Sequence, residues 1–244
     1  MQRTTPPFRA DQVGSILRTA PLKEARAKHE KKEIDDAALK AVEDAEIRKI
    51  IKKQEDVGLK SITDGEFRRS WWHFDFLKKL DGVEGYQASQ GIQFAGVQTR
   101  AEGVRIVSKI GFSNHPMIEH FKFLKANTKE TAKMTIPAPS VLHFRGGRKG
   151  INEKIYPDLD DFFNDLGAAY NKAVKAFYDA GCRYLQLDDT VWAYLCSEKE
   201  LKLAKERGDD PEKLPMWYAR TINQALANKP ADMTITTHVC RGNF

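Results

Sequence analysis

The hydrophobic pattern of the chain alternates between short β-branched runs and longer amphipathic segments. Apolar residues recur at helical spacing in the segment that starts at Asp35 and ends at Gly58. A clearer apolar stripe runs from Leu159 to Ala180, and a further helix is expected around Met216–Leu226. Because strand-like runs precede and follow these helices, the pattern predicts an α/β protein with a parallel sheet.

Five segments are expected to be strands of this sheet: Asp11–Leu17, "LKSITDGEF" (59–67), Met134–Ile136, "RYLQL" (183–187) and Met233–Val239. Pro137 and Pro139 are expected to exclude a helix directly after the third strand. The glycine-rich stretch Asp81–Phe112 interrupts the alternation, so we interpret it as an inserted hairpin or loop. Residues 1–244 are otherwise interpreted as a single domain.

Polar or special residues recur where the predicted strands end. They are Ser15, Glu66, Pro137, Asp188 and His238. A (β/α)8 barrel builds its active site from the carboxyl ends of its strands, so the recurrence favours a barrel. An open doubly wound sheet would also bind ligands at carboxyl ends, but it usually has a glycine-rich phosphate loop, and neither GxGxxG nor GxxxxGK[ST] occurs in the sequence.

Composition narrows the class of protein. A hydrophobic content of 41% is ample for a core, and no run of about 18 apolar residues suggests a membrane span. Three widely spaced cysteines suit free thiols or metal ligands in a reducing compartment, so a soluble, cytoplasmic protein is expected. The net charge of +6 is spread among 34 acidic residues, which argues against nucleic-acid binding and fits an anionic small molecule better.

Two potential zinc ligands, His238 and Cys240, lie two residues apart at the end of the last predicted strand. Alternate residues of a strand point to the same face, so both side chains could reach one ion. Taken alone the pair is a weak motif, and a buried histidine with a core cysteine is the more common explanation of such a pair. Zinc usually takes three or four protein ligands, so any partners would have to come from elsewhere in the fold.

Carboxylates mark two other strand ends. Asp188 and Asp189 follow an apolar strand, where a buried charge is costly, so they are expected to face a site or to cap the next helix. Glu66 follows Gly65, which allows close backbone approach, although Arg68 and Arg69 could simply pair with it. The aromatic residues 71–76 could line a ligand pocket, but packing is the simpler interpretation.

Four ordered segments, "RADQVGSILR", "ITDGEFRRSWWHFDF", "CRYLQLDDTVWA" and "THVCRGNF", resemble the cobalamin-independent methionine synthase family. The resemblance is to its short, single-barrel members, which match the catalytic C-terminal half of the long enzyme. It implies a (β/α)8 TIM-type barrel of which this chain contains about the first five strands. It also implies a zinc ion (Zn2+) and methyl transfer to the thiol of homocysteine, giving methionine.

Matched to the motifs of this family, His238 and Cys240 take the places of its first two zinc ligands. Ser15 matches a serine that contacts the carboxylate of the amino acid, Glu66 a glutamate that holds homocysteine, and Asp188 an aspartate that meets the ammonium group. The family's other Glu and Cys ligands would come from later strands. In place of its pterin-stacking tryptophan the sequence offers His143 or Phe144.

The resemblance therefore predicts an S-methyltransferase that uses homocysteine and a methyl donor, either methyltetrahydrofolate or another methyl carrier. Two alternatives stay open. One is a zinc alkyltransferase or lyase acting on another small thiol. The other is a truncated, catalytically inactive fragment.

Overall fold

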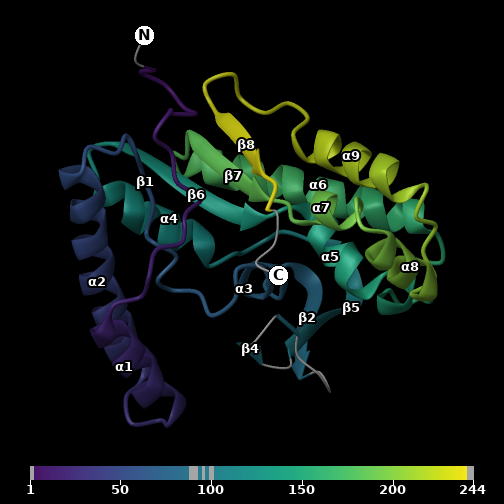
Figure 1. Ribbon diagram of the computed structural model, residues 1–244, viewed down its shortest axis with the longest axis horizontal. Coiled ribbons are helices and arrows are strands. Elements are labelled where there is room, and N and C mark those ends of the chain that lie inside the picture. Colours follow the sequence, from purple (N-terminus) through teal and green to yellow (C-terminus); the bar gives the residue numbers. More distant parts are fainter. Residues whose placement is uncertain (1–2, 88–92, 95–96, 99–101, 241–244) are drawn as a thin grey trace.

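The computed structural model describes residues 3–87, 93–94, 97–98 and 102–240. Its centre is a parallel sheet of β1 (Ser61–Ile62), β6 (Thr131–Pro137), β7 (Tyr184–Asp188) and β8 (Thr234–His238), in the order β1-β6-β7-β8. The predicted α/β class and parallel sheet are confirmed. Within the described residues the sheet is open, with β1 and β8 as its outer strands (Figure 1), so closure into a barrel stays a prediction.

The strand expected at Asp11–Leu17 is not present, and this prediction was wrong. The segment is extended but crosses the sheet (Figure 1), and its carbonyl groups accept hydrogen bonds from side chains of β7 and of the residue after β1. Gln186 donates to the Val13 carbonyl at 2.8 Å, and the Thr63 hydroxyl donates to the Gly14 carbonyl at 2.7 Å. Because side chains satisfy these groups, no backbone ladder is needed.

Helices account for most of the remaining chain. Their bounds are α1 (Ala20–Glu30), α2 (Asp36–Asp56), α3 (Phe74–Leu77), α4 (Met117–Ala126), α5 (Pro139–Gly146), α6 (Leu159–Asp179), α7 (Val191–Tyr194), α8 (Glu198–Glu206) and α9 (Leu214–Ala225), with a 3-10 turn at Arg148–Gly150. Asp35 begins α2 by accepting a hydrogen bond from the Ala38 amide at 2.8 Å. The predicted helices at α2, α6 and α9 are confirmed.

The prolines after β6 act differently from the prediction. Pro137 ends the strand, but Pro139 stands at the first position of α5 rather than excluding a helix. Proline is favoured at that position because its fixed φ is already helical and its missing N–H would have no intrahelical acceptor. The expectation that no helix could follow the third strand was therefore wrong.

The segment expected to be an inserted hairpin contains an antiparallel pair, β2 (Asp81–Gln87) with β5 (Glu102–Gly111). Two short strands between them, β3 (Gln93–Phe94) and β4 (Val97–Gln98), also pair. The Tyr156 hydroxyl, in the segment before α6, accepts a hydrogen bond from the Ile110 amide at 2.7 Å. This contact ties β5 to the main body of the protein. Treatment of the segment as an insertion in one domain stays a prediction.

The two faces of the parallel sheet differ in chemistry. Along β6, Met134 and Ile136 belong to the hydrophobic core, whereas the alternate residues Lys133 and Thr135 bind polar partners. The apolar face packs on helices, and the Tyr170 hydroxyl of α6 donates to the Pro137 carbonyl at 2.8 Å. The polar face lies under the N-terminal segment and is the only place where buried charges gather along the described strands of this sheet.

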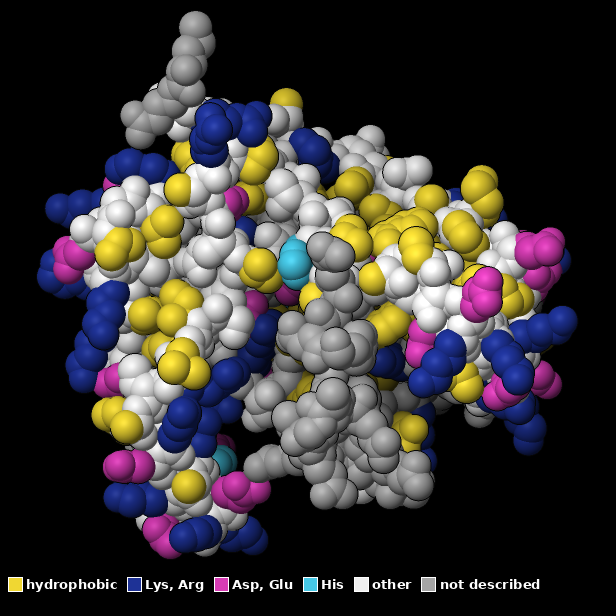
Figure 2. Space-filling view, viewed as in Figure 1, with side chains coloured by type: hydrophobic (Ala, Val, Ile, Leu, Met, Phe, Trp, Pro, Cys, Tyr) yellow, Lys and Arg dark blue, Asp and Glu magenta, His cyan; other side chains and the backbone are white. Residues whose placement is uncertain are grey.

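Surface charge agrees with the sequence. Lys and Arg side chains on the face shown in Figure 2 are interspersed with Asp and Glu and form no single basic patch. In the part of the chain that the structure describes, no helix has the length and apolar character needed to cross a membrane.

Candidate functional site

The first site residue, Glu66, stands in a tight turn directly after β1. Gly65 and Glu66 both have positive φ, 65° and 57°. The Asp64 carboxylate stabilises the turn by accepting a hydrogen bond from the Glu66 amide at 2.8 Å. A glutamate rarely adopts such a backbone conformation, and residues held in it tend to occur at functional sites. The turn aims the Glu66 side chain back over the sheet.

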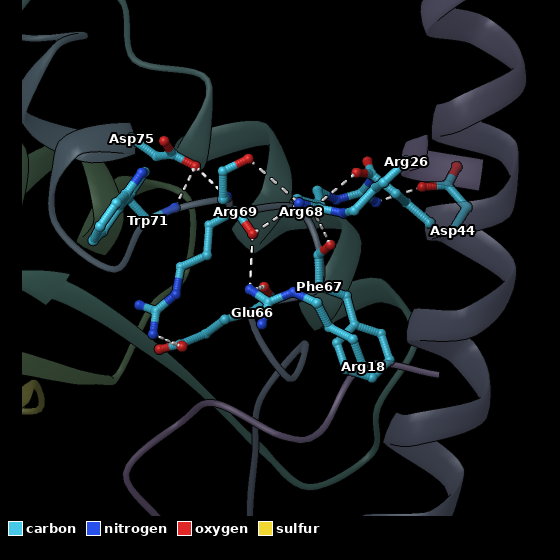
Figure 3. A network of polar contacts seen from close by, with 11 residues as sticks. Arg18, Arg26, Asp44, Glu66, Phe67, Arg68, Arg69, Trp71 and Asp75 are labelled. Atoms are coloured by element: carbon cyan, nitrogen blue, oxygen red, sulfur yellow. Dashed lines mark hydrogen bonds and ion pairs between the residues drawn. The ribbon is translucent and has the colours of Figure 1, made fainter. Parts of the chain in front are cut away.

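The Glu66 carboxylate is buried, with 7% of the residue exposed, and two groups hold it. Oε1 accepts a hydrogen bond from the Thr135 hydroxyl of β6 at 2.5 Å, and Oε2 forms an ion pair with Arg69 (Figure 3). Burial raises the pKa of Glu66, while the Arg69 charge and the Thr135 hydroxyl oppose this rise. Its orientation is therefore fixed from both a strand and a loop.

Gly14 lies against this carboxylate. A Cβ atom at Gly14 would come within 2.9 Å of Glu66 Oε1 and 2.9 Å of Thr135 Cγ2. The next residue, Ser15, is exposed, and the Ile16 amide donates to the Gly65 carbonyl at 3.1 Å. Ser15 is thus an exposed residue between two anchored neighbours, Gly14 and Ile16, next to the polar face of the sheet.

Asp188 ends β7 and is 5% exposed. Gln186, two residues earlier on the same face, donates to Asp188 Oδ1 at 2.7 Å. Burial raises the pKa of Asp188 to about 6, although this hydrogen bond and the charges of Arg69 and Lys133 act in the opposite direction. Asp188 is therefore an anion at neutral pH that is poorly compensated within the described residues and suited to a cation.

His238 pairs with Asp188 in the register of β7 and β8, and its carbonyl accepts a hydrogen bond from the Asp189 amide at 2.9 Å. Burial lowers the pKa of the half-buried His238, and the nearby Lys133 lowers it further. The imidazole is therefore neutral at neutral pH, which is the form that binds metals. Cys240, partly buried, follows two residues later.

His238 and Cys240 are the two candidate zinc ligands of the site. A neutral imidazole and a thiol are suitable ligands, so these two residues fit the ion chemically. No group of three or more His, Cys, Asp or Glu side chains with metal-binding geometry occurs among residues 3–87 and 102–240. The described chain therefore offers half of a tetrahedral set.

Comparison with known proteins assigns the family. The model of the catalytic domain of cobalamin-independent synthase matches residues 8–244. The chain belongs to this family. The uncharacterized protein YxjG of Bacillus subtilis is 51% identical over 100% of the chain. A crystal structure of a candidate vitamin-B12-independent methionine synthase from Listeria monocytogenes is 50% identical, with a TM-score of 0.83 over 99% of the chain. The methionine synthase of Pyrococcus horikoshii is 30% identical over 57% of the chain and 34% of its own length.

The chain spans only part of these family members, 64% of YxjG and 68% of the Listeria chain. The similarity confirms the predicted family and the α/β architecture with its mostly parallel sheet. The activity and the substrates of the whole protein are taken up as proposals below.

The structure brings most of the predicted family residues to one end of the sheet. Glu66, Asp188 and His238 lie close enough for their charges to influence one another: Asp188 raises the pKa of Glu66, and Glu66 opposes the fall in the pKa of His238. Ser15 is next to the glycine that touches Glu66. Their roles in binding substrate or metal remain predictions.

The two residues offered in place of the family's pterin-stacking tryptophan are buried against other aromatic side chains. His143 is buried, and its Nδ1 lies 2.7 Å from the Tyr218 hydroxyl of α9. Phe144 is also buried and stacks on Tyr194, with ring centroids 5.4 Å apart. Neither ring is available for stacking on a ligand at the strand ends.

Sequence reasoning missed Thr135 and Gly14, and it treated the arginines after Glu66 together. The structure separates these arginines, because Arg69 turns back to Glu66 whereas Arg68 pairs with Glu43 and Asp44 of α2 (Figure 3). A signal for Thr135 was present in the alternation Lys133, Thr135 within an otherwise apolar strand.

Proposed function

We propose that this protein is a zinc-dependent S-methyltransferase that converts homocysteine to methionine. The observation that carries the proposal is the gathering of Glu66, Asp188 and His238 at or just after the carboxyl ends of strands of one parallel sheet, where active sites of this architecture are built. The family membership supports it independently.

Each residue has a role that its chemistry suits. Glu66 and Asp188 supply negative charge for the ammonium group of the amino acid, and Ser15 with the neighbouring turn supplies donors for its carboxylate. The sulfur of a homocysteine held in this way would point toward His238 and Cys240. Orienting both reactants is a large contribution to a bimolecular transfer.

His238 and Cys240 would hold the metal together with ligands from outside the described residues. A bound zinc ion would supply the Lewis acidity that keeps the substrate thiol deprotonated, since a free thiol of pKa about 8.5 is mostly protonated at neutral pH. The chain's own contribution is a neutral imidazole, a thiol and a partly enclosed polar face. A cytoplasmic location is part of the proposal and agrees with Cys182 and Cys196, which form no disulfide among the described residues.

The methyl donor is proposed as methyltetrahydrofolate or another methyl carrier. The burial of His143 and Phe144 removes both candidates for a ring that stacks on a pterin, which favours testing other donors alongside the folate.

A methylation assay tests the proposal. Purified protein, both as this chain and extended to the length of its relatives, is incubated with homocysteine and each donor, and methionine is measured. We expect formation that is lost in the His238→Ala, Cys240→Ala double variant and kept in Cys196→Ala, which alters an exposed cysteine outside the site. Undiminished methionine formation by the double variant would refute the zinc-dependent mechanism. Replacing homocysteine by other small thiols in the same assay separates this activity from a zinc alkyltransferase or lyase.

A further inference from the structure

Arg69 occupies the site that the proposed function assigns to the substrate's ammonium group. Its guanidinium forms an ion pair with Glu66 Oε2, and both side chains are buried, 12% and 7% exposed. Figure 3 shows the side chain turned back from its loop onto the Glu66 carboxylate. A protein cation therefore already neutralises the carboxylate that is expected to bind a substrate cation.

A second buried cation nearby, Lys133, is engaged elsewhere, as is Arg68, which pairs with α2. Lys133 Nζ lies 3.2 Å from Asp11 Oδ1 and also donates to the Gln12 carbonyl. Within the described residues no ion pair is formed by Asp188. Arg69 is thus the positive group that can exchange with an incoming ammonium.

The backbone of Arg69 is anchored, and a cavity lies beside its side chain. The Arg69 carbonyl accepts hydrogen bonds from Arg18 at 2.8 Å and from Arg26 at 3.0 Å (Figure 3). The cavity, of about 50 Å³, has a polar lining that consists of Glu66, Arg69, Asp64, Asp75, Thr135, Arg68 and His120. Asp75 Oδ1 also lies 3.1 Å from Lys78 Nζ. A space of that size holds a few water molecules at about 10–15 Å³ each, so it can accept the guanidinium group of Arg69 once these waters are displaced.

We propose that Arg69 is a positioning residue with two alternative sets of carboxylate partners. Without amino acid it neutralises Glu66, and when an α-amino acid binds it yields Glu66 to the ammonium group and turns into the cavity beside Asp64 and Asp75. The exchange replaces one cation by another, so the buried Glu66 carboxylate never lacks a counter-charge. It also selects for ligands that bring a positive charge of their own.

This inference rests on the proposed function and is tested by binding rather than by turnover. L-methionine, the proposed product, and 4-(methylthio)butanoate, which is the same molecule without the ammonium group, are titrated calorimetrically into the wild type and variants. The wild type is expected to bind methionine and to bind the desamino analogue much more weakly. Binding of neither ligand by the wild type would overturn the proposed function itself.

The variants then test Arg69. Removing the competing cation in Arg69→Gln is expected to tighten methionine binding, whereas Asp75→Asn, which removes an alternative partner, weakens it, each by a factor of about five. Arg69→Lys keeps the cation and stays near the wild type. Arg48→Gln is the matched control, because that arginine of α2 donates to Asn127 at 3.2 Å and is not among the residues that line the cavity, and its methionine affinity is expected to stay within about twofold.

A spectroscopic readout separates exchange from a purely structural role. In protein labelled with nitrogen-15 at arginine Nε, the Arg69 resonance, assigned by its absence in Arg69→Lys, should shift with methionine and not with the desamino analogue. If methionine binds the wild type but this resonance stays in place, or if Arg69→Gln weakens methionine binding, the exchange is refuted while the proposed function stands.

Discussion

Asp188 and His238 lie directly opposite each other in the register of β7 and β8, and the next residue, Asp189, donates its amide hydrogen to the His238 carbonyl at 2.9 Å. A residue proposed to bind substrate and a residue proposed to bind metal are therefore neighbours on adjacent strands. Parallel strands place their carboxyl ends at one edge, which explains how residues 50 positions apart in sequence come together.

Zinc content should depend on the two residues at the end of β8. We expect zinc measured by mass spectrometry in purified protein to fall in His238→Ala and in Cys240→Ala, because each removes a nitrogen or sulfur ligand from the proposed set. Cys196→Ala, at an exposed cysteine, should keep the wild-type content. Equal zinc in all four proteins would contradict the assignment of the ligands.

Asp188→Asn should stabilise the folded protein and weaken its binding of methionine. Burial raises the pKa of Asp188 to about 6, so keeping it ionised at pH 7.5 costs the folded state free energy. Removing the charge should raise the free energy of unfolding in urea by about 1–3 kcal/mol, since each pKa unit corresponds to about 1.4 kcal/mol. Methionine binding should weaken at least tenfold.

The exposed Asp179, paired with Lys175, provides the control for this substitution. Asp179→Asn should change the free energy of unfolding by less than about 0.5 kcal/mol and leave binding unchanged. A fall in stability in Asp188→Asn would show that the carboxylate stabilises the fold and would remove the reason for regarding it as a binding group.

Gly14→Ala should damage the site through contact with Glu66. Its Cβ would lie 2.9 Å from Glu66 Oε1, at a φ of 143°. We expect methionine binding to fall at least tenfold. Gly58→Ala is the matched control, because Gly58 also has positive φ, 85°, but no atom within 4 Å of the added Cβ. It should lose about 1–2 kcal/mol of stability from backbone strain and keep its binding. Similar binding losses in both variants would point to general destabilisation.

His143 should make the protein sensitive to acid. Burial, with Arg207 and Arg148 nearby, lowers the pKa of His143 to about 3, although Asp209 Oδ1 lies 3.4 Å from its Nε2 and favours the protonated form. The folded state therefore keeps this ring neutral where the unfolded state gains a proton below pH 6.5. The contribution of neutral His143 to the free energy of unfolding is therefore fully present above pH 6.5 and is lost as the pH falls below it. Between pH 7 and pH 5 this residue should account for about 2 kcal/mol of the loss.

Urea unfolding at both pH values measures this effect. His143→Gln should be less stable than the wild type at pH 7, because the contact with the Tyr218 hydroxyl changes, but its further loss at pH 5 should be smaller by about 2 kcal/mol. A wild-type pH dependence in His143→Gln would contradict the assignment.

The elements that sequence pattern predicted well are those whose burial repeats locally. The apolar stripe of α6 and the short apolar runs of β6, β7 and β8 can be predicted from the helical or strand spacing of their apolar residues. Asp11–Leu17 has the composition of a strand, but its carbonyl groups are satisfied by Gln186 and Thr63 from distant parts of the chain. No local signal could reveal those partners.

In the site, too, some features have a local signal in the sequence and others depend on contacts between distant residues. Strand ends identified Glu66, Asp188 and His238, because a charge or a metal ligand after an apolar run is conspicuous. The conformation of Glu66, at φ 57°, and the separate directions of Arg68 and Arg69 depend on the packing of α1 and α2 against the turn. Those contacts join residues about 25 to 50 positions apart and became visible only in three dimensions.

The most direct test of the central claim is zinc X-ray absorption spectroscopy of the purified protein with and without L-homocysteine. The account predicts one zinc ion whose sulfur coordination rises by one when homocysteine is added, and an unchanged spectrum with homoserine, which has a hydroxyl in place of the thiol. A zinc spectrum that does not respond to homocysteine, or protein that holds no zinc, would contradict it.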